Sequence, residues 1–512
     1  MLNKTGKKTK SVKITWSSDP ARLHARRWWG LVVIAIAQLM IVLDTTIVTI
    51  ALPTAQQDLG MSDSSRQWVI TAYTLTFGGL LLLGGRIADR LGRKRTLIAG
   101  ILGFAVTSAL GGTADSGWTL VTARAGQGAF AALLAPSTLA LLMAVFPGPA
   151  ERARAIGIYS GVLTAGGGIG LVGGGLITSY LDWRWCMYVN IPIALPAALG
   201  AIAALPDPPG RTDARIDVLG ALTGCGGIAA LVYGFSEAGE HGWHTRPVIL
   251  SLALASALLL TFGIAQARLR APLLPLRILT DRDRGAALAT VALATLGLFG
   301  VFLFLTYQLQ SVMGYSAVRT GLAMLPLVAM NVTAATQLSG RLLPKLPPRL
   351  LIVPGLLCAA GSLALLTQLT PHSSYTAVIL PAELFLGLGI GTLFGPAVAT
   401  ATSGVAPHDA GIASATVNTA QQTGASIGTA LLNTIAAGAT GTYLADRHGA
   451  DTLRDATVHG YATAATWALG IMLGTAVLAA LLITADPRKT APCPAAKAPR
   501  PAAPHRAHRL RR

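Results

Sequence analysis

Residues 85–95 read Gly-Arg-Ile-Ala-Asp-Arg-Leu-Gly-Arg-Lys-Arg, a short charged segment between two apolar runs. The run before it covers about 66–85, and the run after it covers about 96–114. Each run is close to the roughly 20 apolar residues that a helix needs to cross a bilayer. The segment therefore predicts a tight, positively charged turn between two membrane-spanning helices.

Apolar runs of this length recur along the whole chain. Of the 512 residues, 52% are hydrophobic and only 12% are charged, whereas a soluble domain averages about 25% charged residues. The composition excludes a soluble multidomain protein and predicts an all-α polytopic membrane protein. We predict fourteen spans, at 28–51, 66–85, 96–114, 118–146, 154–179, 185–204, 217–238, 247–267, 285–310, 319–340, 349–369, 376–402, 408–437 and 462–484.

Basic residues are concentrated in alternate loops between these spans. The loops that would face inward, around 86–95, 152–154, 211–215, 268–284 and 341–349, hold seventeen Lys and Arg, against six in the loops that would face outward. Because Lys and Arg are retained on the cytoplasmic side, we expect both termini in the cytosol and a plasma (inner) membrane location. The net charge of +19 then reflects loops and tails rather than nucleic-acid binding.

The order of the spans predicts two related halves. Residues 85–91 and 340–346 share a Gly-Arg start and a basic residue, and each segment precedes a span at an equivalent place. We predict a basic cytosolic tail (1–27), a six-helix bundle (28–204), two inserted linker helices (205–284) and a second six-helix bundle (285–484). The Pro-, Ala- and Arg-rich tail at 485–512 is expected to be disordered and cytosolic.

No cofactor or metal site is expected. The cysteines, Cys186, Cys225, Cys358 and Cys493, are too far apart for a CxxC-type site. The glycines at 387, 389 and 391 lie in an apolar run and follow no strand, so they are not a nucleotide loop. Without an ATP-binding motif or a catalytic triad, the sequence predicts a protein that is not an enzyme.

Two of the acidic residues lie well inside predicted spans: Asp44 and Glu383. Buried ionisable groups in membranes are costly and are functional candidates by default, and no histidine lies well inside a span. Arg124 belongs to the same outer half of the membrane as Asp44, and we expect the two to meet and to couple proton binding to helix movement. A permanent structural pair, and an Arg124 side chain that reaches the interface, are the alternatives. Glu383 is either a second proton site, a counter-charge for a cationic substrate, or a hydrated residue near the headgroups.

Other polar residues and glycines within the spans suggest a cavity and close helix packing. Amide and hydroxyl groups at such depth should face protein or a wet cavity, and the candidates for the substrate cavity are Thr46, Thr49, Gln127, Asn418, Gln421 and Gln422. Glycines permit close helix contact in lipid, and we assign helix packing to Gly166, Gly170, Gly174 and Gly175.

Taken together, these motifs resemble the major facilitator superfamily, specifically its fourteen-span drug:proton antiporters of the multidrug efflux type. The matching segments, in chain order, are Leu43–Pro53, Gly85–Arg95, Arg124–Gly128, Trp183–Trp185 and Asn190–Pro192. The pattern departs at Thr49, where asparagine is usual, and at Leu171, where proline is usual.

The resemblance implies the major facilitator fold, with two six-helix bundles rocking about a central cavity plus two inserted helices. It also implies proton coupling at Arg124 and a conformational-switch loop formed by Gly85, Asp89, Arg90, Gly92, Arg93 and Lys94.

The function expected from these features is proton-coupled efflux of small hydrophobic or cationic compounds, such as drugs or antibiotics, by alternating access. The expected partners are a small-molecule substrate, protons and membrane lipids, with no nucleic acid, and the expected state is a monomer. A proton symporter that imports a small metabolite, and a non-transporting membrane sensor, are the alternatives.

Overall fold

The computed structural model of the chain describes residues 20–146, 149–207, 217–269, 272, 279–343, 345–405, 410–446 and 452–484. Every regular element within these ranges is a helix, and the predicted all-α fold is confirmed. The predicted N-terminal tail, 1–27, is described only from residue 20 onward, and the predicted C-terminal tail, 485–512, lies outside the described residues.

The first half of the chain and the insertion contain nine helices within the described residues. They are α1 (Pro20–Asp58), α2 (Asp63–Leu91), α3 (Arg93–Gly112), α4 (Gly117–Val145), α5 (Pro149–Tyr180), α6 (Trp185–Tyr188), α7 (Asn190–Ala204), α8 (Val218–His241) and α9 (Arg246–Arg268).

The second half mixes α-helices with three short π-helices, written η. They are α11 (Arg282–Tyr307), η1 (Gln308–Val312), α12 (Ala317–Ala323), α13 (Leu325–Thr333), η2 (Ala334–Ser339), α14 (Gly340–Leu342), α15 (Arg349–Leu366), η3 (Tyr375–Ile379), α16 (Leu380–Ala401), α17 (Ala410–Asp446) and α18 (Thr452–Leu482).

All fourteen predicted spans fall on helical segments. Eleven described segments are long and apolar enough to cross a membrane, and α2, which is bent by 53° near Leu81, would be a twelfth. The predicted spans in α5 and α17 are not among them; the first is rich in glycine and the second in Thr, Asn and Gln. The chain is thus a multi-span membrane protein, and the count of fourteen stays a prediction.

Side-chain caps start several of the helices. Hydroxyls of Ser62, Ser116 and Ser316 accept hydrogen bonds from backbone N–H groups three residues later, at 3.2, 3.3 and 3.3 Å. Asp217 and Asp281 do the same at 2.7 and 3.0 Å. Each cap satisfies a donor that the first helical turn leaves free, so these positions fix where the helices begin.

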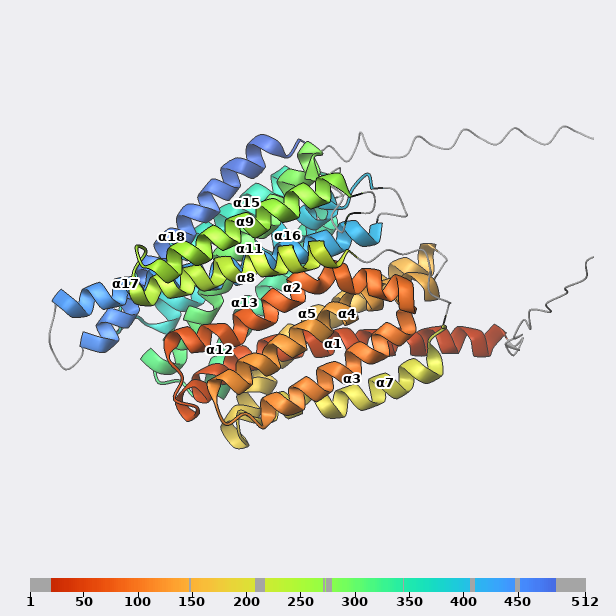
Figure 1. Cartoon of the computed structure of the whole chain (residues 1–512), viewed down its shortest axis with the longest axis horizontal. Helices are drawn as coiled ribbons and strands as arrows, with labels where there is room; N and C mark the ends of the chain where they lie inside the picture. The colour runs from red at the N-terminus through yellow and green to blue at the C-terminus, as the bar shows by residue number, and fades with distance from the viewer. Residues whose placement is uncertain are drawn as a thin grey trace, which may run out of the picture.

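The helices form two bundles that lie side by side, with the first half in red to yellow and the second in green to blue (Figure 1). Of the inserted pair, α9 packs on α8, and α8 packs against α2 and α17, which belong to different halves. Gly79 on α2 meets Cys225 on α8 so closely that an added Cβ would lie 2.7 Å from the sulfur. The hydroxyl of Thr434 on α17 donates to the Phe235 carbonyl on α8 at 2.7 Å. The insertion therefore bridges both halves.

The two halves share an apolar core only toward one end. We call the end that holds the α1–α2 turn the outer end, following the predicted orientation. There, residues such as Ile50, Val69 and Leu120 of the first half belong to the same continuous core as the second half. Toward the other end the first half has a separate core, to which the second half contributes only Ala415 among the described residues. The structure is therefore closed at its outer end.

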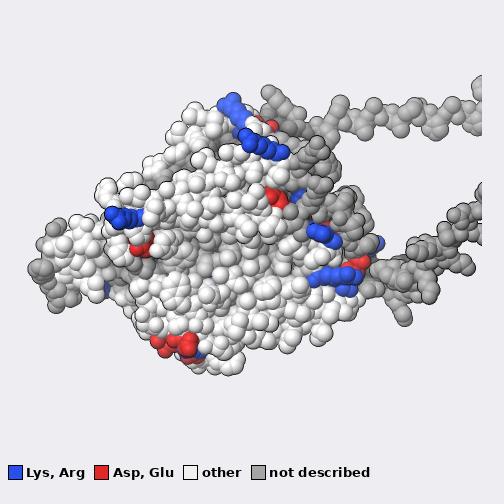
Figure 2. All heavy atoms as spheres, viewed as in Figure 1, with Lys and Arg blue, Asp and Glu red and all other residues white. Residues whose placement is uncertain are grey.

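Charged side chains are sparse on the face shown in Figure 2, where they gather mainly near the ends of the helices. The surface between them is mostly uncharged, and large apolar residues such as Leu222, Leu250 and Trp467 are 61–68% exposed. An apolar belt between charged ends is what contact with lipid requires.

Candidate functional site

Asp44 lies in the middle of the first bundle and is fully buried on α1. Its Oδ2 forms an ion pair with Nη1 of Arg124 on α4, whose side chain is 2% exposed. Its Oδ1 accepts hydrogen bonds from Gln127 Nε2 and Asn190 Nδ2, both at 2.9 Å. The carboxylate thus has a cation and two amide donors, and the predicted meeting of Asp44 with Arg124 is present in the structure.

A second layer of hydrogen bonds holds these donors in place. Gln127 Oε1 accepts from Arg124 Nη1 at 2.8 Å, so this amide orients both members of the pair. The hydroxyl of Ser108 on α3 accepts from Gln127 Nε2 at 2.6 Å and from Asn190 Nδ2 at 3.1 Å. Because these hydrogen bonds run between four helices, the cluster fixes α1, α3, α4 and α7 relative to one another.

Arg124 also contacts α2, which is not part of the carboxylate cluster. Its Nε donates to the Val69 carbonyl at 3.2 Å, and its guanidinium carbon lies 4.3 Å from the centre of the Tyr73 ring. A desolvated guanidinium over an aromatic face is attracted by the ring's electrons. The charge of Asp44 is therefore linked through one arginine to the position of α2.

The first two turns of α2 in turn contact the second half. Arg66 Nη2 donates to Asn433 Oδ1 on α17 at 3.1 Å, and Asn433 Nδ2 donates to Gln67 Oε1 at 2.8 Å. The guanidinium of Arg66 lies 4.3 Å from the Tyr307 ring centre, and the Tyr307 hydroxyl donates to Gln56 Oε1 at 2.9 Å. We call Gln56, Arg66, Gln67, Tyr307 and Asn433 the outer latch, because they join the halves at the outer end.

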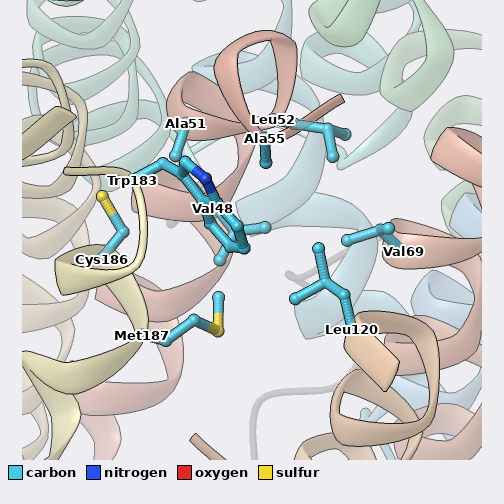
Figure 3. A pocket seen from close by; sticks show the side chains of 9 residues that line it. All are labelled: Val48, Ala51, Leu52, Ala55, Val69, Leu120, Trp183, Cys186 and Met187. Atoms are coloured by element: carbon cyan, nitrogen blue, oxygen red, sulfur yellow. The ribbon is translucent and has the colours of Figure 1, made fainter. Parts of the chain in front are cut away.

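A small apolar pocket lies next to the ion pair, toward the outer end (Figure 3). Its lining side chains are Val48, Ala51, Leu52, Ala55, Val69, Leu120, Trp183, Cys186 and Met187. Almost none of its lining surface is polar, so it offers no group that could orient a polar ligand. We interpret it as a packing gap beside Asp44 rather than as a substrate site.

Glu383, the second buried carboxyl, lies in the other bundle and is not brought to Asp44. It sits near the start of α16 and is fully buried. Its Oε2 accepts from the Tyr375 hydroxyl at 3.3 Å, and its Oε1 has no hydrogen-bond partner among the described residues. The two predicted acidic sites are therefore separate, one in each half.

Comparison with known proteins agrees with this architecture. The family model described as Major Facilitator Superfamily matches residues 34–429. The chain belongs to the major facilitator superfamily. The predicted family is thus confirmed.

Relatives of this superfamily member are export and resistance proteins. It is 53% identical over 462 residues to the puromycin resistance protein pur8 of Streptomyces alboniger, covering 90% of this chain and 92% of that protein. It is 38% identical to the cephamycin export protein CmcT of Amycolatopsis lactamdurans, covering 79% and 84%. It is 32% identical to the multidrug efflux pump LfrA of Mycolicibacterium smegmatis, covering 83% and 84%. The chain is therefore a transport protein and not an enzyme.

Solved structures support the same fold. A bacterial homologue of the human lysosomal transporter Spinster, in an inward-facing and occupied conformation, matches with a TM-score of 0.65 at 17% identity, covering 93% of this chain and 98% of that one. A peptide transporter in complex with sulfate matches with a TM-score of 0.62 at 15% identity, covering 88% and 94%. At these identities the likeness concerns the fold alone.

The predicted cavity residues of this major facilitator protein are distributed over several environments. Gln127 belongs to the ion-pair cluster and is fully buried. The hydroxyls of Thr46 and Thr49 donate to carbonyls of their own helix, at 3.0 and 2.8 Å. On α17, Asn418, Gln421 and Gln422 are half-buried, and Gln422 packs against Gly78 of α2. Of the six, Gln422 is shown in contact with the other half.

The segment at 85–95 forms the tight turn that its sequence predicts. Gly92 has φ of 100°, a conformation that favours glycine, and separates α2 from α3. Arg93 pairs with Asp89 at 3.3 Å, with side chains 38% and 43% exposed. Lys94 donates to the carbonyls of Ile202 and Leu205 at 2.7 and 3.0 Å, at the end of α7. Arg90 is exposed, and Gly85 packs normally against Pro136.

The glycines of α5 allow close packing against two partners. An added Cβ at Gly166, Gly170 or Gly174 would lie within 2.9 Å of Leu39, Thr46 or Ile47 of α1. One at Gly175 would lie 2.6 Å from the Ala317 carbonyl of α12, in the other half. Three of the four predicted packing glycines thus serve the first bundle, and the fourth serves the closed outer end.

Sequence reasoning missed several residues of these clusters. Asn190 had been noted only as part of a motif at the entry to a span, although an amide in an apolar run is a signal in itself. Ser108 gives no such signal, because serine is common in spans. Arg66 stands at the start of the predicted span 66–85, where a basic residue is expected to face the outer loop, whereas the structure buries it to 5% exposure in the outer latch. Its partner Asn433 is remote in sequence and could not be paired with it.

Proposed function

We propose that this protein exports small hydrophobic or cationic antibiotic-like compounds across the plasma membrane in exchange for protons, by alternating access. Both termini would lie in the cytosol, and the two halves, 28–204 and 285–484, would rock about the insertion 205–284. The working unit would be a monomer surrounded by lipid, with no cofactor and no nucleic-acid partner. The observation that carries the proton coupling is the buried Asp44–Arg124 pair and its contact with α2.

Export rather than import is favoured by the relatives. Proteins named for puromycin resistance, cephamycin export and multidrug efflux all align over most of this chain. The 53% identity to the puromycin resistance protein makes puromycin, an amphipathic amine, the first compound to test.

The structure suggests how a proton would act on the halves. When Asp44 is ionised, it balances the charge of Arg124, and Arg124 holds the Val69 carbonyl of α2. A proton on Asp44 would leave the guanidinium buried without a counter-charge, which is strongly unfavourable. Arg124 would then shift, and α2, which carries Arg66 and Gln67 of the outer latch, would shift with it.

The closed outer end supports a place for this structure in the proposed cycle. With the outer latch formed and Asp44 paired, it would correspond to an inward-facing state that has released its proton and can accept substrate from the cytosol. Opening of the outer end would release the substrate and expose Asp44 to external protons, and the shift of Arg124 and α2 that follows proton binding in this open state would allow the outer end to close again. The proton-motive force supplies about 2.3 kcal/mol per charge at 100 mV.

The direct test is puromycin transport in proteoliposomes under a pH gradient, comparing the parent with Asp44→Asn. We expect the variant to lose uptake driven by the gradient, while passive exchange of the bound compound persists. Asp58→Asn is a matched control, since Asp58 lies on the same helix but pairs with Arg184 at the exposed outer end, at 2.8 Å. Gradient-driven transport by Asp44→Asn at the parent rate would exclude Asp44 as the proton site.

Import by symport is the competing transport function, and everted vesicles separate the two. In an antiporter, added substrate dissipates an imposed inside-acid pH gradient because protons leave as substrate enters. A symporter would instead move substrate and protons in the same direction. A non-transporting sensor would show neither effect.

A further inference from the structure

The apolar pocket of Figure 3 lies on the outer side of the Asp44 cluster, one helical turn away from it. Three lining residues are each three or four positions from a member of the cluster, and in each pair the lining residue is nearer the outer end. The pairs are Val48 with Asp44, Leu120 with Arg124, and Met187 with Asn190. A fourth lining residue, Val69, supplies the carbonyl that accepts from Arg124 Nε. The pocket therefore stands between the buried carboxylate and the outer solution.

Trp183 closes the outer side of this pocket. Its side chain is 3% exposed, and its Nε1 donates to Asp58 Oδ2 at 3.0 Å. Asp58 is 46% exposed and follows Ala55, a lining residue, by three positions. Arg184 donates to the same oxygen at 2.8 Å, and its guanidinium carbon lies 4.6 Å from the centre of the Trp183 ring. One indole ring therefore separates the pocket from groups that reach the outer solution.

The chemistry of the pocket is suited to excluding water. Its size admits about one water molecule, but a buried water needs about two to four polar partners. The indole N–H of Trp183 is already engaged with Asp58, and the sulfur atoms of Cys186 and Met187 are weak hydrogen-bonding groups. Apolar cavities stay dry, and apolar constrictions block passage by dewetting. A proton therefore has no path through the pocket as long as it stays closed.

We infer that this pocket is a dry seal, which keeps external protons from Asp44 while the outer end is closed, and that Trp183 is the positioning residue that maintains it. The inference rests on the proposed exchange of substrate for protons. In the inward-facing state Asp44 has released its proton to the cytosol, so a proton that arrived from outside would cross without moving substrate. The seal prevents this loss.

The seal is built to open together with the outer end. Val69, which lines the pocket, belongs to α2, and the first turns of α2 carry Arg66 and Gln67 of the outer latch. When the latch breaks, this side of the pocket is no longer held in place and water enters. An external proton then binds one carboxylate oxygen of Asp44.

Proton leak in the absence of substrate tests the seal. The full-length protein is reconstituted in liposomes with a trapped pH-sensitive dye, an acid-outside gradient is imposed, and potassium with valinomycin compensates the charge that moves. The parent should hold the gradient, whereas Trp183→Ala should dissipate it faster. Trp185→Ala is the matched control, because Trp185 is 52% exposed and packs edge-on against Tyr188 rather than lining the pocket. Asp58→Asn keeps an acceptor oxygen for the indole and should also stay tight.

A Trp183→Ala variant that holds the gradient, or an equal leak in Trp185→Ala, would overturn the inference. Adding Asp44→Asn to Trp183→Ala should stop the leak, because the proton then has no site to bind. An undiminished leak in this double variant would show that protons bypass Asp44, and would overturn the claim that the seal guards it. A tight Trp183→Ala variant that still exchanges puromycin for protons rejects the seal alone. A parent that exchanges no protons for puromycin rejects the proposed function.

Alkylation of Cys186 reports water entry independently of proton movement. Cys186 is fully buried and lines the pocket. Iodoacetamide should therefore label it slowly in the parent and faster in Trp183→Ala, as read by mass spectrometry of its peptide, while labelling of Cys225 beside α2 and α8 stays unchanged. Trp183→Phe keeps most of the ring and should stay close to the parent in both assays.

A second variant tests the seal with Trp183 in place, should Trp183→Ala not fold. Leu120→Asn puts an amide into the pocket at nearly the same side-chain size, so water gains polar partners. We expect faster labelling of Cys186 and a proton leak in this variant as well. Labelling of Cys186 at the parent rate in Leu120→Asn would overturn the inference.

Discussion

The charge on Asp44 should be energetically coupled to the charge on Arg124, and a double-mutant cycle measures that coupling. Asp44→Asn leaves the Arg124 guanidinium, 2% exposed, with the Val69 carbonyl, Gln127 Oε1 and the Tyr73 ring but without a counter-ion. Removing one partner of a buried pair costs about 3–5 kcal/mol, because the remaining charge is uncompensated. Asparagine keeps the shape and one acceptor, and Asn190 has a free Oδ1 that can turn toward the new amide. We therefore expect Asp44→Asn to lower the free energy of unfolding by about 3 kcal/mol, the lower end of that range.

Arg124→Gln should lower the free energy of unfolding by a similar amount, since the Asp44 carboxylate then keeps only the hydrogen bonds from the amides of Gln127 and Asn190. Additive effects would give about 6 kcal/mol in the double variant, twice the single cost. Contacting residues show coupling of about 0.5–3 kcal/mol, and a buried ion pair belongs at the upper end. We expect the double variant to lose only about 3–4 kcal/mol.

The assay is unfolding of the purified protein in mixed micelles by increasing SDS, followed by loss of helical circular dichroism. The free energy of unfolding is compared for the parent, the two single variants and the double variant. A double variant whose loss equals the sum of the single losses would refute the argument that the buried charges depend on each other. A control cycle at the exposed pair of Asp58 and Arg184 should show much weaker coupling.

Three further predictions concern the closed outer end and the turn at 85–95. Arg66→Ala removes the outer-latch guanidinium and leaves the amides of its partners buried without that hydrogen-bond donor. We therefore expect faster alkylation of a cysteine placed on the outer face of α1. Unchanged alkylation would show that the latch does not hold the halves together. Gly175→Ala places a Cβ 2.6 Å from a backbone oxygen of the other half, so spin-label distance measurements should show a larger population of the outer-open state. Gly173→Ala is the control, because its Cβ has nothing within 4 Å. Equal effects of the two substitutions would contradict the reasoning. Asp89→Asn should lower the free energy of unfolding by about 1 kcal/mol or less, because the ion pair of Asp89 with Arg93 is exposed. Loss of transport without loss of stability would identify a role of Asp89 in conformational switching.

Features that depend on local composition and spacing could be predicted from the amino-acid sequence. Apolar runs of spanning length predicted where the helices lie, because a helix in lipid must satisfy its own backbone groups. The scarcity of buried ionisable residues singled out Asp44, Arg124 and Glu383, since each carries a cost that an inert position would not retain. The positive φ at Gly92 likewise follows from a glycine between two charged helix ends.

The contacts among these residues could not be predicted from the sequence and are seen only in the folded chain. Ser108 and Asn190 join the Asp44 cluster from α3 and α7, and Asn433 reaches Arg66 across 367 positions of sequence. These contacts depend on how whole helices cross, and crossing geometry is set by side chains far apart in the chain, so no local pattern records them.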